Sequence, residues 1–404
     1  MMGADNTRRG HGRLQLRPAR ALACAASIVL CGCAAEDGVD VEEQAGDTTS
    51  VVSRAGPSWA SDRLASIDLV IGAADGADEY TFGRLEPIAL TSDAGVVVYD
   101  QMYNRISRFG ADGEFRGFIG SSGQGPGEYD AVVGLAWNAE TLFVQLYDGR
   151  ILLYSSDGAY LSEWRAGRPL AQDHALTPVR DSLLVLKTTG RAEPEAAFLV
   201  VSARGEVLDS VPWVATPWDH EVGRGQSDIT PSRSSIWSPA DFGVSVVGSR
   251  LAFQKLDPQG SVLRLLRDYE PATFLADERA DWEAQNRFLR QRSGDPSRFP
   301  PVPDHKPVVR RVFSPPSGEI WLLVATPSIG PDPGHIEVMG GLRTTPEWLE
   351  PLRMEVFGPN GDYLGAVTGP PGLDVRAVGD GVIWAYRNGA LGEQHIVRLR
   401  VERP

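Results

Sequence analysis

The sequence predicts an all-β fold, a six-bladed β-propeller with four-stranded antiparallel blades. Three observations predict it: five hairpin patterns recur along the chain, their spacing matches the length of one blade, and the two ends of the chain supply complementary strands of a last blade. A fixed internal period of this kind is typical of repeat architectures.

Each of the five hairpins has an alternating strand, a four-residue turn that ends in glycine, and a second strand. The hairpins span residues 105–120, 150–164, 197–211, 251–266 and 352–367. We expect a positive φ at the last turn residues, which are Gly113, Gly158, Gly205, Gly260 and Gly361. These glycines are 45, 47, 55 and 101 residues apart, and a unit of roughly 45 residues corresponds to one four-stranded blade.

A pair of inner strands is expected before each hairpin. Alternating apolar patterns place four of these pairs at residues 87–100, 132–148, 175–187 and 308–325, whereas the fourth unit, near residues 236–247, is less regular. A sixth unit, residues 375–402, has only three predicted strands. We expect residues 63–72 to pair with residues 396–401, which would complete this blade and remove an open sheet edge.

The long last interval contains an insertion, residues 275–304, that breaks the β pattern. Residues 275–294 predict a helix, with Asp277 as its cap, acidic residues in its first turn and arginines in its last turn. Trp282, Gln285 and Leu289 have helical spacing, so we expect them to pack on the rim of the propeller.

The N-terminal segment has the features of an export signal. All three cysteines, Cys24, Cys31 and Cys33, follow an arginine-rich start, and the apolar run at residues 21–32 is too short to cross a bilayer. Residues 30–33, LCGC, resemble the lipobox of bacterial lipoproteins. That resemblance implies that residues 1–32 are a signal peptide, that Cys33 carries the lipid, and that Ala34 and Ala35 favour the outer membrane.

The mature chain is strongly acidic. Its formal charge of −14 becomes −18 when residues 1–32, with five Arg and one Asp, are removed, so nucleic acid is not an expected partner. Residues 33–58 are acidic and rich in small residues, which predicts a flexible tether between the lipid and a folded part that begins near Trp59.

Two motifs in the first unit resemble known families. Asp100, Asn104, Arg105 and Ile106 resemble the core of an NHL repeat, and residues 123–129, GQGPGEY, resemble the signature loop of bacterial six-bladed β-propeller lipoproteins. The resemblance covers residues 59–404, while its NHL part is clear only in the first unit. It implies a propeller fold and leaves the function of the individual repeats open.

The glycine-rich segment at residues 120–129 is interpreted as a connection between blades. It follows a strand and contains Pro126 instead of opening a helix, which is unlike a phosphate-binding loop. Glu128 is expected to accept hydrogen bonds from backbone amides there. No common hydrolase, nucleotide-binding or zinc-protease motif is present, and the body of the chain has no cysteine for thiol or zinc chemistry.

Residues that start the innermost strands of a propeller line its central channel, which gives positional candidates for ligand contacts. They are Glu86, Asp130, His174, His305, Lys306, Asp374 and Arg376. No cofactor is predicted, although carboxylates and imidazoles converging on the channel could hold calcium or zinc.

The sequence therefore predicts a lipid-anchored, extracytoplasmic propeller that binds a protein or a small ligand and faces the periplasm or the cell surface. Two alternatives are compatible with the same residues. One is a metal-dependent hydrolase or lyase of the gluconolactonase-like or amidating-lyase-like kind, which would need at least three of the acidic and histidine candidates to converge. The other is a structural component of the envelope.

Overall fold

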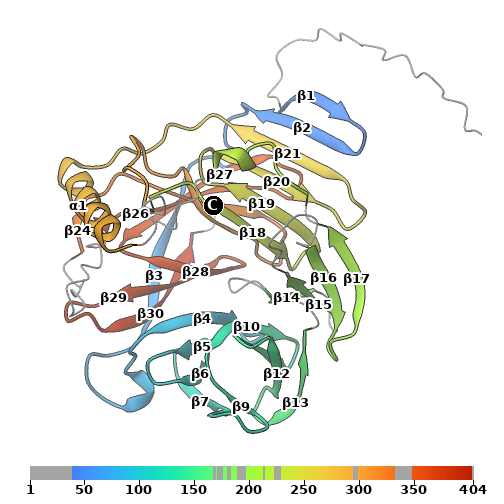
Figure 1. Cartoon of the computed structure of the whole chain (residues 1–404), viewed down its shortest axis with the longest axis vertical. Coiled ribbons are helices and arrows are strands. Elements are labelled where there is room, and N and C mark those ends of the chain that lie inside the picture. The colour runs from blue at the N-terminus through green and yellow to red at the C-terminus, as the bar shows by residue number, and fades with distance from the viewer. Residues whose placement is uncertain are drawn as a thin grey trace, which may run out of the picture. The chain divides into compact units, whose positions relative to one another are not determined.

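The computed structural model has the all-β architecture that the sequence predicts, with one α-helix among the residues that it describes (Figure 1). These residues are 39–166, 170, 176–179, 183–188, 197–212, 214–222, 229–293, 299–332 and 348–402. The predicted signal peptide, Cys33 and His174 lie outside them.

Three sheets have four antiparallel strands each, arranged in chain order. The first contains β4 (Leu85–Leu90), β5 (Val96–Asp100), β6 (Arg105–Phe109) and β7 (Phe115–Ile119). The second contains β10 (Val132–Asn138), β11 (Thr141–Leu146), β12 (Arg150–Ser155) and β13 (Tyr160–Arg165). The third contains β14 (Leu176–Val179), β15 (Leu183–Lys187), β16 (Ala197–Ser202) and β17 (Val207–Pro212).

Two larger sheets contain the same four-stranded unit. In a six-stranded sheet, the unit comprises β18 (Arg233–Ser238), β19 (Phe242–Val247), β20 (Ala252–Leu256) and β21 (Val262–Arg267). An eight-stranded sheet begins with β22 (Val309–Phe313), β23 (Ile320–Val324), β26 (Pro351–Phe357) and β27 (Tyr363–Pro371). It continues through β3 (Arg63–Ile71), β30 (Gln394–Val401), β29 (Val382–Asn388) and β28 (Asp374–Gly379).

The predicted pairing of residues 63–72 with residues 396–401 is confirmed. β3 and β30 are antiparallel, and their register runs from Ala65 opposite Val401 to Ile71 opposite Ile396. On its other side β3 meets β27 in a short parallel contact, which joins the two halves of the eight-stranded sheet. The early strand β3 and the last described strand, β30, therefore lie in one sheet, as expected for a closed ring.

The first strands of successive units are neighbours around a common centre (Figure 1). β4 contacts β10, and β14 contacts both β10 and β18. β18 also contacts β22, and β28 contacts β4. This arrangement of sheets around a centre is that of a β-propeller.

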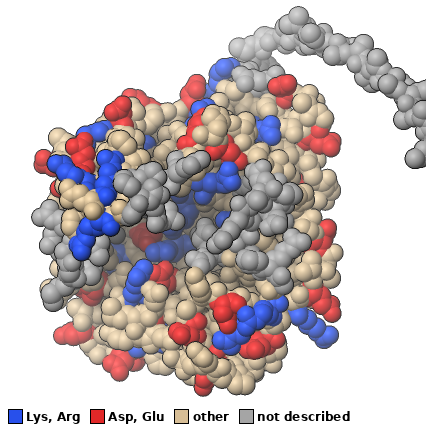
Figure 2. All heavy atoms as spheres, in the orientation of Figure 1, with Lys and Arg blue, Asp and Glu red and all other residues tan. Residues whose placement is uncertain are grey.

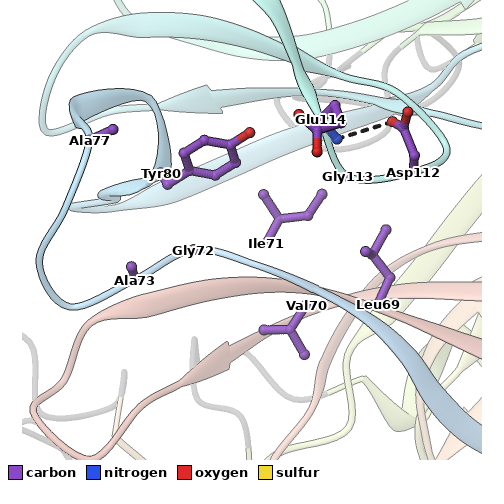
Figure 3. A pocket seen from close by; sticks show the side chains of 10 residues that line it. All are labelled: Leu69, Val70, Ile71, Gly72, Ala73, Ala77, Tyr80, Asp112, Gly113 and Glu114. Carbon is purple, nitrogen blue, oxygen red and sulfur yellow. Dashed lines mark hydrogen bonds between the residues drawn. The ribbon is translucent and has the colours of Figure 1, made fainter.

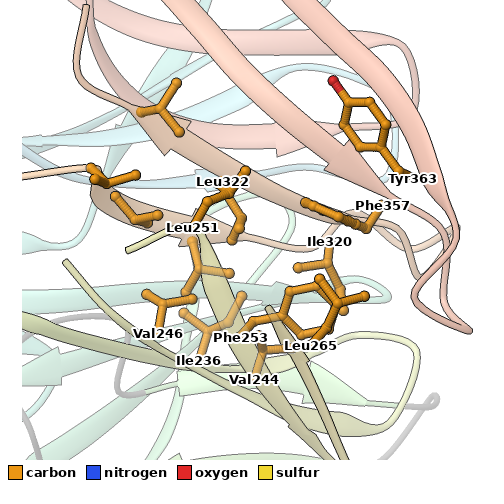
Figure 4. Close-up of a cluster of buried hydrophobic side chains, with 14 of the residues drawn as sticks. Ile236, Val244, Val246, Leu251, Phe253, Leu265, Ile320, Leu322, Phe357 and Tyr363 are labelled. Atoms are coloured by element: carbon orange, nitrogen blue, oxygen red, sulfur yellow. The ribbon is translucent and has the colours of Figure 1, made fainter. Parts of the chain in front are cut away.

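Apolar side chains fill the space between neighbouring units. In the cluster shown in Figure 4, Val244 and Phe253 of one unit pack with Leu322 and Phe357 of the next. The Phe253 and Phe357 rings are 5.3 Å apart between centroids at an interplanar angle of 68°. Burying one phenylalanine contributes about 1.5–3 kcal/mol, so these clusters hold adjacent sheets together.

The five predicted turn glycines all have a positive φ. The angles are 83° at Gly113, 86° at Gly158, 82° at Gly205, 92° at Gly260 and 91° at Gly361. A side chain with a Cβ would be strained there, which explains why glycine recurs at the same place in each hairpin.

The residues that resemble an NHL core organise the turn after β5. The buried carboxylate of Asp100 accepts hydrogen bonds from the backbone N–H groups of Gly83 (2.8 Å), Arg84 (3.1 Å) and Met102 (3.0 Å). Asn104 has a φ of 46°, which asparagine tolerates, and its side-chain Oδ1 accepts a hydrogen bond from the Tyr99 hydroxyl. The motif thus has a structural role in this chain.

The glycine-rich segment connects two units, as the sequence predicts. It runs from β7 through the two-residue strands β8 (Ser121–Ser122) and β9 (Glu128–Tyr129) to β10. The Glu128 carboxylate accepts a hydrogen bond of 2.8 Å from the Gly125 N–H, as expected. The Tyr129 hydroxyl accepts one from the Ile106 N–H (2.9 Å) and donates one to the Ile119 carbonyl (3.0 Å).

The predicted flexible tether is wrong for part of residues 33–58. β1 (Val39–Ala45) and β2 (Thr48–Ser53) form a hairpin, and β2 pairs in parallel with β21 from Thr48 opposite Val262 to Ser53 opposite Arg267. Val51 and Val52 are buried. Composition misled the prediction because backbone pairing with an open sheet edge depends little on the acidic character of the added strand.

The predicted helix is present as α1 (Ala276–Arg292). Its N-cap is Leu275, not Asp277, because the Glu278 carboxylate accepts a hydrogen bond of 3.1 Å from the Leu275 N–H. Trp282, Gln285 and Leu289 are half-buried, while the buried side chains of the helix are polar, Glu278 and Asn286. Within the described part of the chain, no helix is both long and apolar enough to span a membrane.

Candidate functional site

The candidate site comprises the residues at which the first strands of the units begin. Four of these strands carry one extra residue near their start, between Leu85 and Ile88 in β4, at Val133 in β10, at Arg310 in β22 and at Arg376 in β28. Such β-bulges redirect side chains and are common at the rims of barrels and beside binding sites. We call the charged residues at these strand starts the rim.

At the rim, Asp374 lies between two arginines. Its Oδ2 is 2.5 Å from a guanidinium nitrogen of Arg376, and its Oδ1 is 3.6 Å from Nη1 of Arg311. Arg311 Nη1 also donates a hydrogen bond of 2.7 Å to the Val375 carbonyl. The starts of β22 and β28, two successive first strands, are thereby linked by charged groups.

Tyr386 connects this cluster to β4. It lies opposite Asp374 in the ladder of β28 and β29, and its hydroxyl donates a hydrogen bond of 2.8 Å to the Glu86 carbonyl. The Arg376 guanidinium lies 5.1 Å from the centroid of its ring. Burial raises the pKa of Tyr386, and the nearby carboxylates raise it further, so the phenol stays neutral and acts as a hydrogen-bond donor.

A second charged group lies beside Arg310. The Glu350 carboxylate is 2.5 Å from Arg310 Nη2 and 2.9 Å from Lys306 Nζ. Lys306 Nζ is also 2.7 Å from Glu278 Oε1 and 2.7 Å from the hydroxyl of Ser328. Lys306 therefore fixes helix α1 to the sheet and uses its donors inside the protein.

Basic residues also lie at and near the start of β18. Arg233, the first residue of β18, is 2.7 Å from Asp219. Lys187, at the end of β15, donates a hydrogen bond of 3.2 Å from Nζ to the Ser235 carbonyl in β18. Figure 2 shows basic side chains in and around the hollow at the centre of this face.

The structure brings together three of the residues predicted from the sequence. Asp374 and Arg376 form an ion pair, and Glu86 joins them through Tyr386 while its own carboxylate is 2.9 Å from Arg84 Nε. Asp130 is exposed in the turn before β10, and His305 is exposed beside Thr273.

Lys306 is the prediction that the geometry contradicts most clearly. Its side chain is 0% exposed, so it cannot contact a ligand in the channel in this state. The sequence shows Lys306 shortly before an inner strand, but the carboxylates that bury it come from α1 and from a distant loop.

A metal centre finds no support in the described residues. No three His, Cys, Asp or Glu side chains gather there in a group that could hold a metal ion. His174 is outside these residues, so four of the five acidic and histidine candidates can be compared, and they do not form one coordination sphere.

The sequence did not predict that Arg233, Arg310 and Arg311 are rim residues. The signal was available in part, since residues 308–313, VVRRVF, place two arginines inside an otherwise apolar inner strand. The residue pattern does not indicate the bulge at Arg310, because the extra residue between Val309 and Arg311 is a property of the backbone register between β22 and β23.

A separate pocket of about 430 Å³ lies at the outer strand β3 (Figure 3). Leu69, Ile71 and Tyr80 line it together with the turn that contains Asp112, whose carboxylate accepts a hydrogen bond from the Glu114 N–H. None of the rim residues lines this pocket.

No family model and no curated protein matches the chain. Among solved structures, a member of the DUF4221 family from Bacteroides vulgatus is similar, with a TM-score of 0.53 and 10% identity over 85% of this chain and 99% of that one. A protein from Bacteroides fragilis whose name describes it as exported has a TM-score of 0.48 and 10% identity over 84% of this chain and 100% of that one. BamB from Moraxella catarrhalis has a TM-score of 0.36 and 10% identity over 83% and 96%.

These likenesses concern the fold alone. The chain has a propeller-type all-β fold, and its resemblance to NHL repeats and to six-bladed propeller lipoproteins still depends on the sequence motifs.

Proposed function

We propose that the chain is a lipid-anchored, extracytoplasmic six-bladed β-propeller that acts as a binding module, and that it contacts a protein or small-molecule partner at the rim. The observation that carries the proposal is a set of arginines at the first position of an inner strand, at a bulge or next to one: Arg233, Arg310, Arg311 and Arg376.

The count of six blades is supported by the repeated unit. There are six sets of four strands when the eight-stranded sheet is divided at the contact between β27 and β3. Apolar clusters lie between successive sets, and one of them joins Trp384 and Ile396 of the last set to Val96 and Phe109 of the first. Such contacts would close a ring of six.

A binding role is favoured over catalysis by the chemistry of the rim. Arginine is always charged, so it is a poor acid or base, but its planar guanidinium recognises carboxylates and phosphates with two parallel hydrogen bonds. Glu350 and Asp374 are partners of Arg310 and Arg376, and the described acidic groups at the rim are not gathered around a metal position.

Export and lipidation are tested with two cysteine variants. Because only Cys33 occupies the lipobox position, we expect Cys33→Ser to lose incorporation of labelled palmitate and to leave the membrane fraction, whereas Cys31→Ser keeps both. Two results would contradict the anchor. One is equal palmitate labelling of the two variants, and the other is labelling of both that is no different from that of the unmodified chain.

Binding is tested by photo-crosslinking in intact cells. A photoreactive residue at Val133, the bulged position of β10, should give adducts of defined mass, and the same residue at Leu161, 53% exposed on the outer strand β13, should not. Identical adducts at both positions, or none at Val133, would overturn the assignment of the partner to the rim.

A further inference from the structure

We propose that Arg311 and Arg376 form an anion-binding site that Asp374 occupies in the resting protein, and that a carboxylate or phosphate group of the ligand replaces Asp374 there. This inference rests on the proposed binding function and names the chemistry that the rim would recognise. It concerns the junction between the starts of β22 and β28.

The contacts of Asp374 with the two arginines resemble those of a bound carboxylate ligand. One oxygen of Asp374 faces Arg376 at 2.5 Å and the other faces Arg311 at 3.6 Å, so a single carboxylate bridges two guanidinium groups from neighbouring first strands. Arg376 is the bulged residue of β28, and the bulge turns its side chain toward this junction. A ligand carboxylate or phosphate presents the same oxygens to the same donors.

Both arginines are held by groups other than Asp374. The guanidinium of Arg376 lies over the Tyr386 ring, and Tyr386 is in turn fixed by its hydrogen bond to the Glu86 carbonyl. Arg311 is held by its hydrogen bond to the Val375 carbonyl. The two cations would therefore keep their places when the carboxylate between them leaves.

Asp374 can be displaced at low cost. It is the first residue of β28 and its side chain is 48% exposed, whereas those of Arg311 and Arg376 are 32% and 26% exposed. Exposed ion pairs contribute little to stability, so exchange of one anion for another at this position leaves the fold intact.

Arg376 still has a hydrogen-bond donor available at the site. A guanidinium carries five N–H donors, and Nε of Arg376 is buried without a hydrogen-bond partner among the residues that the structure describes. An unsatisfied buried donor calls for an explanation, and a ligand anion that accepts a hydrogen bond from Nε would supply one.

The test uses the mature chain, with inorganic phosphate and acetate as probes at constant ionic strength and calorimetric titration as the readout. We expect Asp374→Asn to bind at least one probe about tenfold more tightly than the unmodified chain, because the competing internal carboxylate is removed. Arg376→Gln and Arg311→Gln should each weaken binding by about tenfold or more. Preference for phosphate or for acetate identifies which group the site takes.

Matched controls come from an exposed pair on another strand. Arg116 lies 2.5 Å from Asp112, and these side chains are 46% and 53% exposed. Asp112→Asn and Arg116→Gln make the same changes of charge, so they should leave the affinity for both probes unchanged. Arg376→Lys keeps the charge but loses the planar fork, and it should bind more weakly than arginine.

Three results would overturn the inference: unchanged affinity in Asp374→Asn, no saturable binding of either probe to that variant, or equal effects of the control variants. If the titrations overturn the anion site but the photoreactive residue at Val133 still gives adducts, the anion site is wrong and the proposed binding function stands. If the anions bind as expected but Val133 gives no adducts, the anion site stands and the assignment of the partner to the rim is overturned.

Discussion

Glu278 of helix α1 and Lys306 form a buried ion pair, with Oε1 and Nζ 2.7 Å apart and the two side chains 3% and 0% exposed. Ser328 completes the contact, since its hydroxyl donates a hydrogen bond of 3.0 Å to the same Oε1. The inserted helix is thus attached through charged groups more than through an apolar face. Removal of the Lys306 charge leaves the Glu278 carboxylate buried without this cation.

We therefore expect Lys306→Met to lower the free energy of unfolding by about 3–5 kcal/mol, measured by urea denaturation. The paired change Glu278→Leu with Lys306→Met should cost less than Lys306→Met alone, because no helix carboxylate is then left uncompensated. As a control, Glu283→Gln breaks an exposed pair with Arg279 and should change stability by less than about 1 kcal/mol. A Lys306→Met variant as stable as the control would contradict the role of the pair.

The hydrogen bonds of Tyr129 lead us to expect a second effect on stability. Its buried hydroxyl satisfies the Ile106 N–H and the Ile119 carbonyl, which lie opposite one another in the ladder of β6 and β7. Tyr129→Phe should lower the free energy of unfolding by about 1–3 kcal/mol, because both backbone groups lose a partner. Tyr147 is 68% exposed, so Tyr147→Phe is the matched control and should have almost no effect in the same denaturation experiment.

The same tyrosine predicts a loss of stability at high pH. Burial raises the pKa of Tyr129 from 10.0 to about 12. Between these values the unfolded chain releases a proton that the folded chain keeps, so stability is full below pH 10 and declines as the pH rises toward 12. Thermal unfolding from pH 9 to 12 should show a smaller decline for Tyr129→Phe than for the unmodified chain. Parallel declines would contradict this assignment.

The parts of the fold that repeat could be predicted from the sequence. Glycines such as Gly113 and Gly361 mark hairpin turns because their backbone angle requires them, and the pairing of β3 with β30 follows from one missing strand and one unassigned strand. Both predictions depend on local patterns that every unit repeats.

The parts that depend on contacts between distant residues could not be predicted. Lys306 was assigned to the channel because of its position before an inner strand, but its partners Glu278 and Glu350 come from elsewhere in the chain. At the rim, Asp374 and Arg376 were found because they start a strand, while Arg311 was missed because its partner belongs to the next unit.

Among the residues that the structure describes, the acidic and histidine candidates do not gather in one group, and the next prediction concerns metal content. We expect the purified mature chain to contain no stoichiometric calcium or zinc after mild dialysis, and its thermal midpoint to be unchanged by a chelator. Elemental analysis measures the first and calorimetry the second. One equivalent of either metal would favour the alternative of a hydrolase or lyase, with His174 as the first residue to replace.

The last prediction concerns the hairpin of β1 and β2. Amide exchange can distinguish an ordered hairpin from the flexible tether that the sequence predicts. Backbone amides of Thr48–Ser53 that pair with β21 should exchange with deuterium far more slowly than those of an unstructured segment. Replacing Val51 with Pro removes a backbone donor and should release the hairpin, so that exchange becomes fast throughout residues 48–53 while β18–β20 stay protected. Because Val51→Thr keeps the N–H and the β-branched shape, it should retain slow exchange. Fast exchange of residues 48–53 in the unmodified chain would restore the tether that the sequence predicts.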